Sequence, residues 1–261
     1  MQTTDSLASS AEASVPRIST NGQDAGHAKP KSSEMHPGPG FRIRSRIERA
    51  PLDLIKQFSA FETPDISDLM NRLYTMSSSI MNRVNDQAIC GPACTVKVYP
   101  GDNLMVHKAL DLAQPGDIIV VDAGGSHMNG IIGDLVSTKA KHRGIAGFVI
   151  DGLIRDLPGI QEAGMPVFAR GVTPIGPLHR GPGEINFPIS CGGIVVNPGD
   201  IIMGDKNGVT VVRKDFAAEV LERAYKQRDA LRDYVASVQK GVFSNAWVDK
   251  LLAGDGCIFI D

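Results

Sequence analysis

The chain changes from polar residues to a regular mixture of apolar runs and turns at about Phe41, and this pattern predicts its elements. Apolar residues at helical spacing predict helices over 51–60, 63–74, 103–113, 134–142 and 216–239. Apolar runs between turns predict strands over 94–100, 118–123, 147–151 (followed by a loop over 152–156), 166–171, 192–196, 200–205 and 208–212. This order predicts an α/β fold, either a single-domain layered sandwich or a barrel-like mixed sheet flanked by helices.

The first forty residues differ in composition from the rest. Residues 1–40 are rich in Ser, Ala, Gly and Pro, and they contain too few large apolar side chains to offset their ordering entropy by burial. We therefore expect a disordered tail over 1–40 and a single domain over 41–261 that ends in a C-terminal helix. The tail lacks the basic start and apolar centre of a secretory signal, which favours a cytoplasmic protein.

Composition and charge narrow the function class. Apolar residues make up 42% of the 261 residues, which is enough for a full core. No apolar run approaches the ~20 residues that span a bilayer. The formal net charge of -2 disfavours a nucleic-acid partner. The four cysteines form no CxxC pair, so we interpret them as reduced thiols rather than as a zinc site.

The segment from Asp134 to Asp156 carries the strongest chemical pattern. Asp134 begins a predicted helix, where the free N–H groups of Leu135 and Val136 would attract a carboxylate. Arg155 follows a predicted strand and loop, and its planar guanidinium can donate two hydrogen bonds to a carboxylate or a 2-oxo oxygen. Asp156 can bind Mg²⁺ or Mn²⁺, which prefer oxygen ligands, and Asp134 could orient a water or act as a base.

Such a group of residues suits the cleavage of a 2-oxo acid. A divalent metal at the 2-oxo group acts as a Lewis acid and stabilises the enolate that forms when the C3–C4 bond breaks. Retro-aldol cleavage and decarboxylation of a 3-carboxy-2-oxo acid both form this enolate, so one site can run both reactions. A competing interpretation stays open here, because adjacent Arg-Asp pairs often only cap a loop or form a surface ion pair worth ~0–1 kcal/mol.

Long segments of the chain resemble a known enzyme family. They are GDNLMVHKALDLAQPGDIIVVDAGG, GDLVSTKAKHRGIAGFVIDGLIRD and GMPVFARGVTP, at 101–125, 133–156 and 164–174. In the second, Asp134 is followed by the twenty residues 135–154 and then by Arg155-Asp156. This resembles the 4-hydroxy-4-methyl-2-oxoglutarate aldolase family, also called 4-carboxy-4-hydroxy-2-oxoadipate aldolase. The resemblance covers roughly residues 60–240 and implies the fold of the regulator of ribonuclease E activity A (RraA), with a phosphohistidine-swivelling-type core.

The resemblance implies a role for each residue of this pattern. Asp156 would ligate the divalent metal, Mg²⁺ or Mn²⁺. Arg155 would bind the pyruvyl part of the substrate and stabilise the enolate, and Asp134 would hydrogen-bond metal-bound water. The pyruvate carboxylate would bind to backbone groups at the start of the helix, those of Gly133, Leu135 and Val136.

The resemblance further implies a homotrimer or homohexamer with sites between subunits. An acidic residue from the C-terminal helix of a neighbouring subunit would face the metal waters. In this chain Asp229 is the first candidate for that residue and Glu222 is the second.

Several other polar residues have two possible interpretations. His127, in the turn GGSHMNG, could contact the distal carboxylate of the substrate or be a solvated loop histidine. Arg170 and Lys206 are further candidates for that end of a dicarboxylate. His107 is interpreted as a packed histidine rather than a base.

Three hypotheses for the function follow. The first is a metal-dependent lyase that cleaves a 4-hydroxy-2-oxo diacid to pyruvate and a second 2-oxo acid, with oxaloacetate decarboxylase activity. The second is a non-catalytic, RraA-like regulator that binds a partner, and the third is an enzyme of the same fold that acts on another acid. The complete set of Asp134, Arg155 and Asp156 favours an enzyme, because a partner-binding scaffold does not need it.

Overall fold

The computed structural model describes residues 34–260, and residues 1–33 and 261 lie outside that range. The chain divides into the units Met1–Met35 and His36–Asp261, and all described helices and strands belong to the second. The tail expected over 1–40 therefore falls mostly outside the described residues. At its described end, Gly38 forms a β-bridge with Phe41, and the Gly40 N–H donates to Glu184 Oε1 at 2.9 Å.

A mixed sheet forms the centre of the second unit, as the sequence predicted. Its strands are β1 (Phe41–Ile43), β2 (Met81–Asn82), β3 (Ile89–Val98), β4 (Ile118–Asp122), β5 (Gly147–Ile154), β6 (Val167–Val172), β7 (Gly183–Ile185), β10 (Ile201–Asp205) and β11 (Gly208–Val212). The order is β1-β7-β3-β4-β5-β6-β2, and β10 extends the sheet from β3 to β11. Strands β3, β4, β5 and β6 run parallel to one another. Two further strands, β8 (Ile189–Cys191) and β9 (Ile194–Val196), form a separate antiparallel pair.

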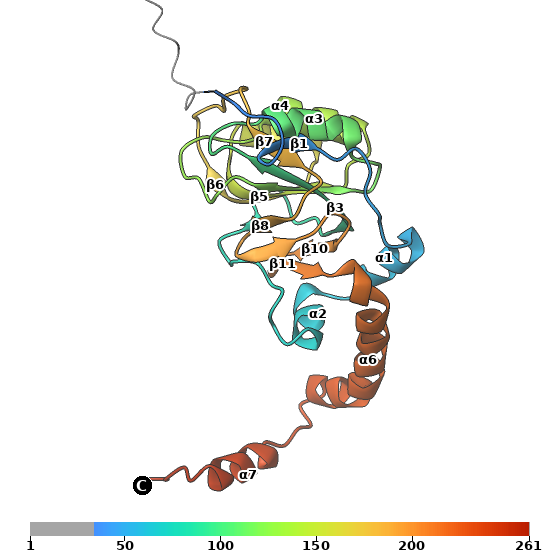
Figure 1. The fold of residues 1–261 in the computed structure, drawn as a ribbon. Coiled ribbons are helices and arrows are strands. Elements are labelled where there is room, and N and C mark those ends of the chain that lie inside the picture. The colour runs from blue at the N-terminus through green and yellow to red at the C-terminus, as the bar shows by residue number, and fades with distance from the viewer. Residues whose placement is uncertain (1–33, 261) are drawn as a thin grey trace, which may run out of the picture. The chain divides into compact units, whose positions relative to one another are not determined.

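Helices cover both sides of these strands (Figure 1). They are α1 (Leu52–Phe58), α2 (Thr63–Leu69), α3 (Leu104–Leu112), α4 (Asp134–His142), α5 (Leu157–Ala163), α6 (Ala217–Gln239) and α7 (Ala246–Gly254), with a short 3-10 turn at Lys214–Phe216 before α6. Helices α3 and α4 lie over one side of the sheet, whereas α1, α2 and α6 lie beyond β10 and β11. None of the helices within 34–260 has both the length and the apolar character that crossing a bilayer requires.

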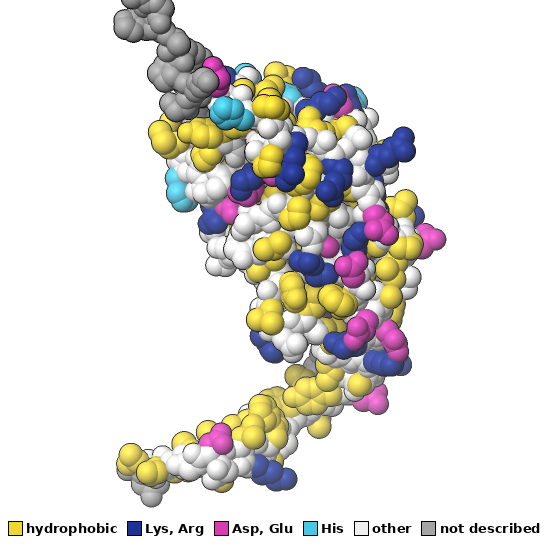
Figure 2. Space-filling model, in the orientation of Figure 1, with side chains coloured by type: hydrophobic (Ala, Val, Ile, Leu, Met, Phe, Trp, Pro, Cys, Tyr) yellow, Lys and Arg dark blue, Asp and Glu magenta, His cyan; other side chains and the backbone are white. Residues whose placement is uncertain are grey.

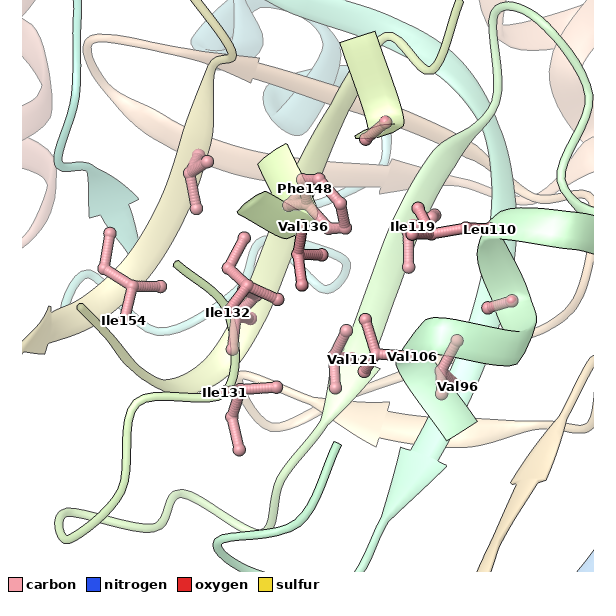
Figure 3. Packing of buried hydrophobic residues seen from close by; sticks show 14 of the residues in the cluster. Val96, Val106, Leu110, Ile119, Val121, Ile131, Ile132, Val136, Phe148 and Ile154 are labelled. Carbon is pink, nitrogen blue, oxygen red and sulfur yellow. The ribbon is translucent and has the colours of Figure 1, made fainter. Parts of the chain in front are cut away.

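Both faces of the central strands are buried, which explains their continuous apolar runs. In β4, Ile119 and Val121 pack on the side of α3 and α4, whereas Ile118 and Val120 pack toward β8–β11. Figure 3 shows the first of these clusters, with Val121 beside Val106 of α3. A third cluster joins α1, α2 and α6 to the outer face of β10 and β11. The helix-covered side of β4 and β5 is the side on which the predicted site begins.

The structure corrects the predicted end of the strand 147–151. Strand β5 continues to Ile154, so the loop predicted over 152–156 is wrong for residues 152–154. The pairing of β5 with β6 shifts register around Gly152, and such a bulge bends a strand without ending it. As a result, the last residue of the strand lies directly before Arg155.

Three helix assignments also differ from the sequence pattern. Helix α5 was not predicted, because it begins with Leu-Pro-Gly, although proline is tolerated in the first turn of a helix. Helix α7 was not predicted either, and it follows α6 without burying any residue, so the described chain ends in two helices. The helix predicted over 63–74 ends at Leu69, because Asn71 and Arg72 have positive φ angles of 57° and 64°.

The four cysteines are free thiols. Cys94 and Cys191 are buried, Cys90 is partly buried and Cys257 is exposed. Burial raises the pKa of Cys94 to about 12, so this thiol stays protonated at neutral pH and is a poor nucleophile or metal ligand.

Candidate active site

One cavity gathers the residues that the sequence predicted to carry the chemistry. It has a volume of about 380 Å³ and lies between α3, the start of α4, the end of β5 and the segment 176–179. Its lining includes all six residues of the predicted pattern, Gly133, Asp134, Leu135, Val136, Arg155 and Asp156. A wider groove of about 570 Å³ between α2 and α6 contains none of them.

The N-terminus of α4 forms one wall of the cavity. Gly133 has extended backbone angles, and Asp134 is the first residue of the helix. The N–H and the hydroxyl of Ser137 both donate to Gly133 O, at 3.1 and 2.9 Å, which fixes this turn. Asp134 Oδ1 accepts the Leu135 N–H at 2.7 Å. One of the backbone donors predicted to bind a substrate carboxylate is therefore already engaged by a carboxylate of the chain itself.

Arg155 and Asp156 lie where β5 turns into α5. The Arg155 N–H donates to Ile132 O at 3.0 Å, which ties this turn to the segment before α4. Asp156 has a positive φ of 53°, a conformation that aspartate tolerates better than most residues. Arg155 Nε lies 3.1 Å from Asp156 Oδ2, and the two side chains are 40% and 38% exposed. Both charged groups are thus held close together and remain accessible to a ligand.

Glycines allow neighbouring segments to approach this pair closely. A Cβ atom on Gly133 would lie 2.3 Å from Asp156 Oδ2, and one on Gly176 would lie 2.8 Å from Arg155 Nη1. No real Cβ tolerates such distances, so either the carboxylate or the guanidinium would have to move. The absence of a side chain at these two positions therefore leaves room for the present arrangement.

A second wall of the cavity carries nitrogen groups from α3, α4 and the segment 176–179. The rings of His107 and His179 pack edge to face with 5.5 Å between their centroids. Asn103 Oδ1 lies 2.6 Å from His179 Nδ1. Burial lowers the pKa of His107, and the charge of Lys139 lowers it further. The interpretation of His107 as a packed histidine was incomplete, because its ring also lines the cavity.

Three other candidate residues lie away from this cavity. His127 is exposed in the loop after β4 and is not part of the lining. Asp229 and Glu222 lie on α6, which packs against α1 and α2, and they pair with Arg232 and Lys226 of the same helix at 2.5 Å each. Within one copy of the chain neither acid is at the cavity, so a contribution from α6 would need another copy.

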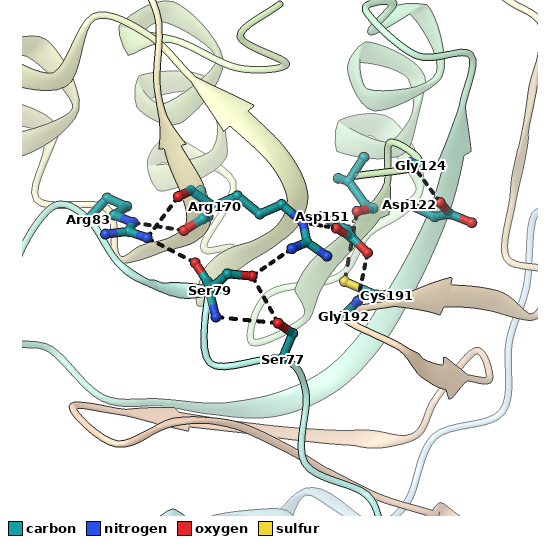
Figure 4. Close-up of polar contacts among 11 residues, drawn as sticks. Ser77, Ser79, Arg83, Asp122, Gly124, Asp151, Arg170, Cys191 and Gly192 are labelled. Atoms are coloured by element: carbon teal, nitrogen blue, oxygen red, sulfur yellow. Dashed lines mark hydrogen bonds and ion pairs between the residues drawn. The ribbon is translucent and has the colours of Figure 1, made fainter. Parts of the chain in front are cut away.

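Arg170 belongs to a different polar network, shown in Figure 4. Its Nε donates to Asp151 Oδ1, and its Nη1 donates to Ser79 Oγ at 2.6 Å. Asp151 Oδ2 also accepts the Gly192 N–H at 2.7 Å. These bonds join β5 and β6 to the turn between β8 and β9, which gives Arg170 a structural role. Lys206 forms an exposed ion pair elsewhere, so the structure brings neither cation to the cavity.

The side chains of the cavity fit a hard divalent cation that keeps most of its water. Asp134 and Asp156 supply two carboxylates. Across residues 34–260, no group of three His, Cys, Asp or Glu side chains is placed to hold a metal ion. Mg²⁺ often binds through one or two carboxylates, whereas a structural zinc ion needs four protein ligands. The accessible Asp156 carboxylate therefore fits Mg²⁺ or Mn²⁺ and does not fit a structural zinc site.

Comparison with known proteins identifies the family. The family model for RraA-like proteins, described as Aldolase/RraA, matches residues 63–211, a range that includes every residue of the cavity. This chain belongs to the RraA-like family. A relative from Halalkalibacterium halodurans, named "Putative 4-hydroxy-4-methyl-2-oxoglutarate aldolase", is 44% identical over 182 residues. The match covers 70% of this RraA-like chain and 87% of the relative.

Solved structures of similar proteins confirm the predicted RraA-like fold. RraAS2 of Streptomyces coelicolor, described as an unusual member of the RNase ES inhibitor RraA family, has a TM-score of 0.66 at 27% identity. That match covers 72% of this chain and 98% of RraAS2. An uncharacterized protein from Pseudomonas syringae pv. tomato has a TM-score of 0.66 at 26% identity, over 76% of this chain and 97% of its own. Some relatives in the RraA-like family are thus named as aldolases and others as RNase inhibitors. The names alone do not distinguish these functions, so the residues of the cavity are the evidence to use.

Among the residues of the RraA-like cavity that sequence reasoning missed are Asn103 and His179. They are 76 positions apart, and only the folded chain brings them together. Asn103 could have been noticed, because it is the first residue of the helix predicted over 103–113, within the resembling segment 101–125. His179 lies in a segment rich in Gly and Pro without any regular pattern, so no signal marked it.

Proposed function

We propose that this RraA-like protein is a divalent-metal-dependent lyase that cleaves a 4-hydroxy-2-oxo diacid to pyruvate and a second 2-oxo acid. Decarboxylation of oxaloacetate is the proposed companion reaction, because it forms the same pyruvate enolate. The proposal rests on one observation, the convergence of Asp134, Arg155 and Asp156 with the N-terminus of α4 in a single cavity. The name of the 44% identical relative supports it.

Each of these residues has a proposed task. Arg155 binds the 2-oxo end of the substrate and stabilises the negative charge that develops on the enolate oxygen, since its guanidinium can donate two hydrogen bonds to one group. The N–H groups of Leu135 and Val136 bind the C1 carboxylate at the positive end of α4, and Asp134 then turns from the Leu135 N–H toward water. Asp156 holds Mg²⁺ or Mn²⁺, which supplies Lewis-acid polarisation of the 2-oxo group when bound.

The assembly is part of the proposal. The cavity of one copy contains two carboxylates, those of Asp134 and Asp156, and a neighbouring copy of the chain could supply a third. We propose a homotrimer or homohexamer in which Asp229 or Glu222 on α6 of one copy faces the cavity of another. Hydrophobic side chains gather at the end of α6 and over α7 (Figure 2), and among them Leu231, Trp247 and Leu251 are exposed. An apolar surface of this kind is typical of an interface. Sedimentation of the full-length protein as a monomer at micromolar concentration would contradict this assembly.

The other two hypotheses make different predictions. A regulator that only binds a partner has no need for two carboxylates and a guanidinium around one cavity, whereas a lyase requires them. An enzyme of the same fold that acts on another acid would keep the site of Asp156 and Arg155 but reject both substrates named above.

The lyase is tested with purified full-length protein and oxaloacetate, with pyruvate measured by coupling to lactate dehydrogenase. With Mg²⁺ or Mn²⁺ we expect turnover at least about tenfold above that of EDTA-treated protein, and recovery when the metal is restored. Samples with metal and no protein correct for spontaneous decarboxylation. The same assay with 4-hydroxy-4-methyl-2-oxoglutarate tests aldol cleavage. If metal stimulates turnover of neither substrate, the lyase proposal is wrong.

A further inference from the structure

The contact between Asn103 and His179 fixes which nitrogen of the imidazole carries hydrogen. Asn103 is 2% exposed, and its Nδ2 donates to Ile131 O at 2.8 Å. This bond orients the amide, so Oδ1 is the atom that lies 2.6 Å from His179 Nδ1. An amide oxygen only accepts hydrogen bonds, and therefore Nδ1 must donate. In neutral His179 the other nitrogen, Nε2, then carries a free lone pair.

Backbone hydrogen bonds hold His179 in place. The Leu178 N–H donates to Gly101 O at 2.8 Å, and the Asn103 N–H donates to Leu178 O at 3.0 Å. The Arg180 N–H donates to Asp102 Oδ2 at 2.5 Å. The residues on both sides of His179 are thus tied to the segment that also carries Asn103. Such a fixed backbone orients the imidazole before any ligand binds.

The same segment reaches Arg155. Asn129 Nδ2 donates to Gly176 O at 2.6 Å, and the Arg155 guanidinium lies against Gly176. His179 is three positions after Gly176 in the chain, so their Cα atoms lie at most ~11 Å apart. Arg155 and His179 therefore belong to connected segments and line the same cavity.

The roles proposed above leave the base of the reaction unassigned. Retro-aldol cleavage requires removal of the proton from the C4 hydroxyl. In the proposed arrangement the substrate carboxylate takes the place of Asp134 at the Leu135 N–H, and Asp134 turns to water. Asp156 holds the metal ion and lies 3.1 Å from Arg155 Nε, so neither carboxylate is assigned to the C4 hydroxyl. We propose that His179, oriented by Asn103, is the general base that takes this proton, an assignment that rests on the proposed lyase function.

The step balances with groups of this chain alone. Nε2 takes the proton of the C4 hydroxyl as the C4 carbonyl forms and the C3–C4 bond breaks. The bonding electron pair passes to C3 and on to the enolate oxygen beside Arg155. Asn103 Oδ1 meanwhile accepts from the Nδ1–H of the imidazolium, as a neutral orienting amide does in other catalytic sites. The imidazolium then returns its proton to C3, which gives pyruvate and restores the base.

Comparison of two substrates tests this role, because oxaloacetate has no C4 hydroxyl proton to remove. Its decarboxylation uses the same enolate site but no base at C4. For His179→Gln we expect kcat for 4-hydroxy-4-methyl-2-oxoglutarate to fall about 100-fold, while oxaloacetate decarboxylation stays within about threefold. Asn103→Ala should also lower kcat for aldol cleavage selectively, because the His179 imidazole loses its orientation. The loss should be smaller than in His179→Gln, because the imidazole keeps its lone pair. A merely structural role for either residue would reduce both reactions together.

The control is His142→Gln, a change of an exposed histidine in the last turn of α4 that does not line the cavity. It should leave both reactions unchanged. His179 is itself exposed at the surface, so its replacement does not threaten the fold. Equal losses in the two reactions, or no loss in either, would overturn the assignment of His179 while the lyase proposal stands. Absence of both reactions in the unsubstituted protein would overturn both proposals.

Discussion

Asp156→Asn is expected to lower metal-stimulated kcat/KM for oxaloacetate by about 10³-fold, since Lewis-acid stabilisation of the enolate is worth several kcal/mol. The substitution preserves shape and the positive φ of 53°, because asparagine tolerates this conformation as aspartate does. It removes the negative charge that a hard cation needs. The loss is measured by comparing kcat/KM with saturating Mn²⁺ and with EDTA.

A binding measurement separates loss of metal from damage to Arg155, which lies 3.1 Å from the same carboxylate. Mn²⁺ binding, followed by electron paramagnetic resonance, should weaken in Asp156→Asn. It should also weaken in Gly133→Ala, whose new Cβ would lie 2.3 Å from Asp156 Oδ2 and displace the carboxylate without removing it. The control Asp86→Asn alters a carboxylate that is 83% exposed and pairs with a surface lysine. Unchanged Mn²⁺ affinity in Asp156→Asn would contradict the assignment of the metal ligand.

The sequence was sufficient to predict that Asp134 and Arg155 meet, and the structure gives the physical reason. Strands β4 and β5 are parallel neighbours, and Asp122 at the end of β4 lies opposite Asp151 of β5. The segments that leave adjacent parallel strands emerge at the same edge of a sheet, where ligands of α/β proteins bind. What the sequence pattern did not show was that β5 continues past the bulge around Gly152 to Ile154, directly before Arg155.

The second wall of the cavity could not be predicted in the same way. Asn103 and His179 meet because backbone bonds join the turn before α3 to an irregular segment before β7. Neither segment has a hydrophobic period, so local sequence carries no information about their pairing. Arg170 shows the opposite error. Its charge suggested a substrate contact, but in the folded chain Asp151 and Ser79 bind it.

Arg155→Lys is expected to lower kcat for oxaloacetate decarboxylation and for aldol cleavage alike, by about 10²–10³-fold, the cost of losing one well-placed donor to a developing oxyanion. Lysine keeps the charge but is a single point donor, whereas the guanidinium offers a planar pair of N–H groups. Lysine also cannot place its ammonium as a planar group beside Gly176, where the guanidinium now lies.

Steady-state kinetics and thermal unfolding distinguish this role from a structural one. Arg155 is 40% exposed and its ion pair with Asp156 is therefore weak, so the melting temperature should hardly change. The matched control is Arg72→Lys, at a side chain that is 72% exposed and pairs with Asp68 on the surface. We expect Arg155→Lys to lower kcat for both substrates and His179→Gln to lower kcat only for aldol cleavage. This pair of results would assign stabilisation of the enolate to Arg155 and removal of the C4 hydroxyl proton to His179. Near-normal turnover in Arg155→Lys would mean that positive charge alone suffices, and the proposal of a bidentate hydrogen bond from the guanidinium to the substrate would be wrong.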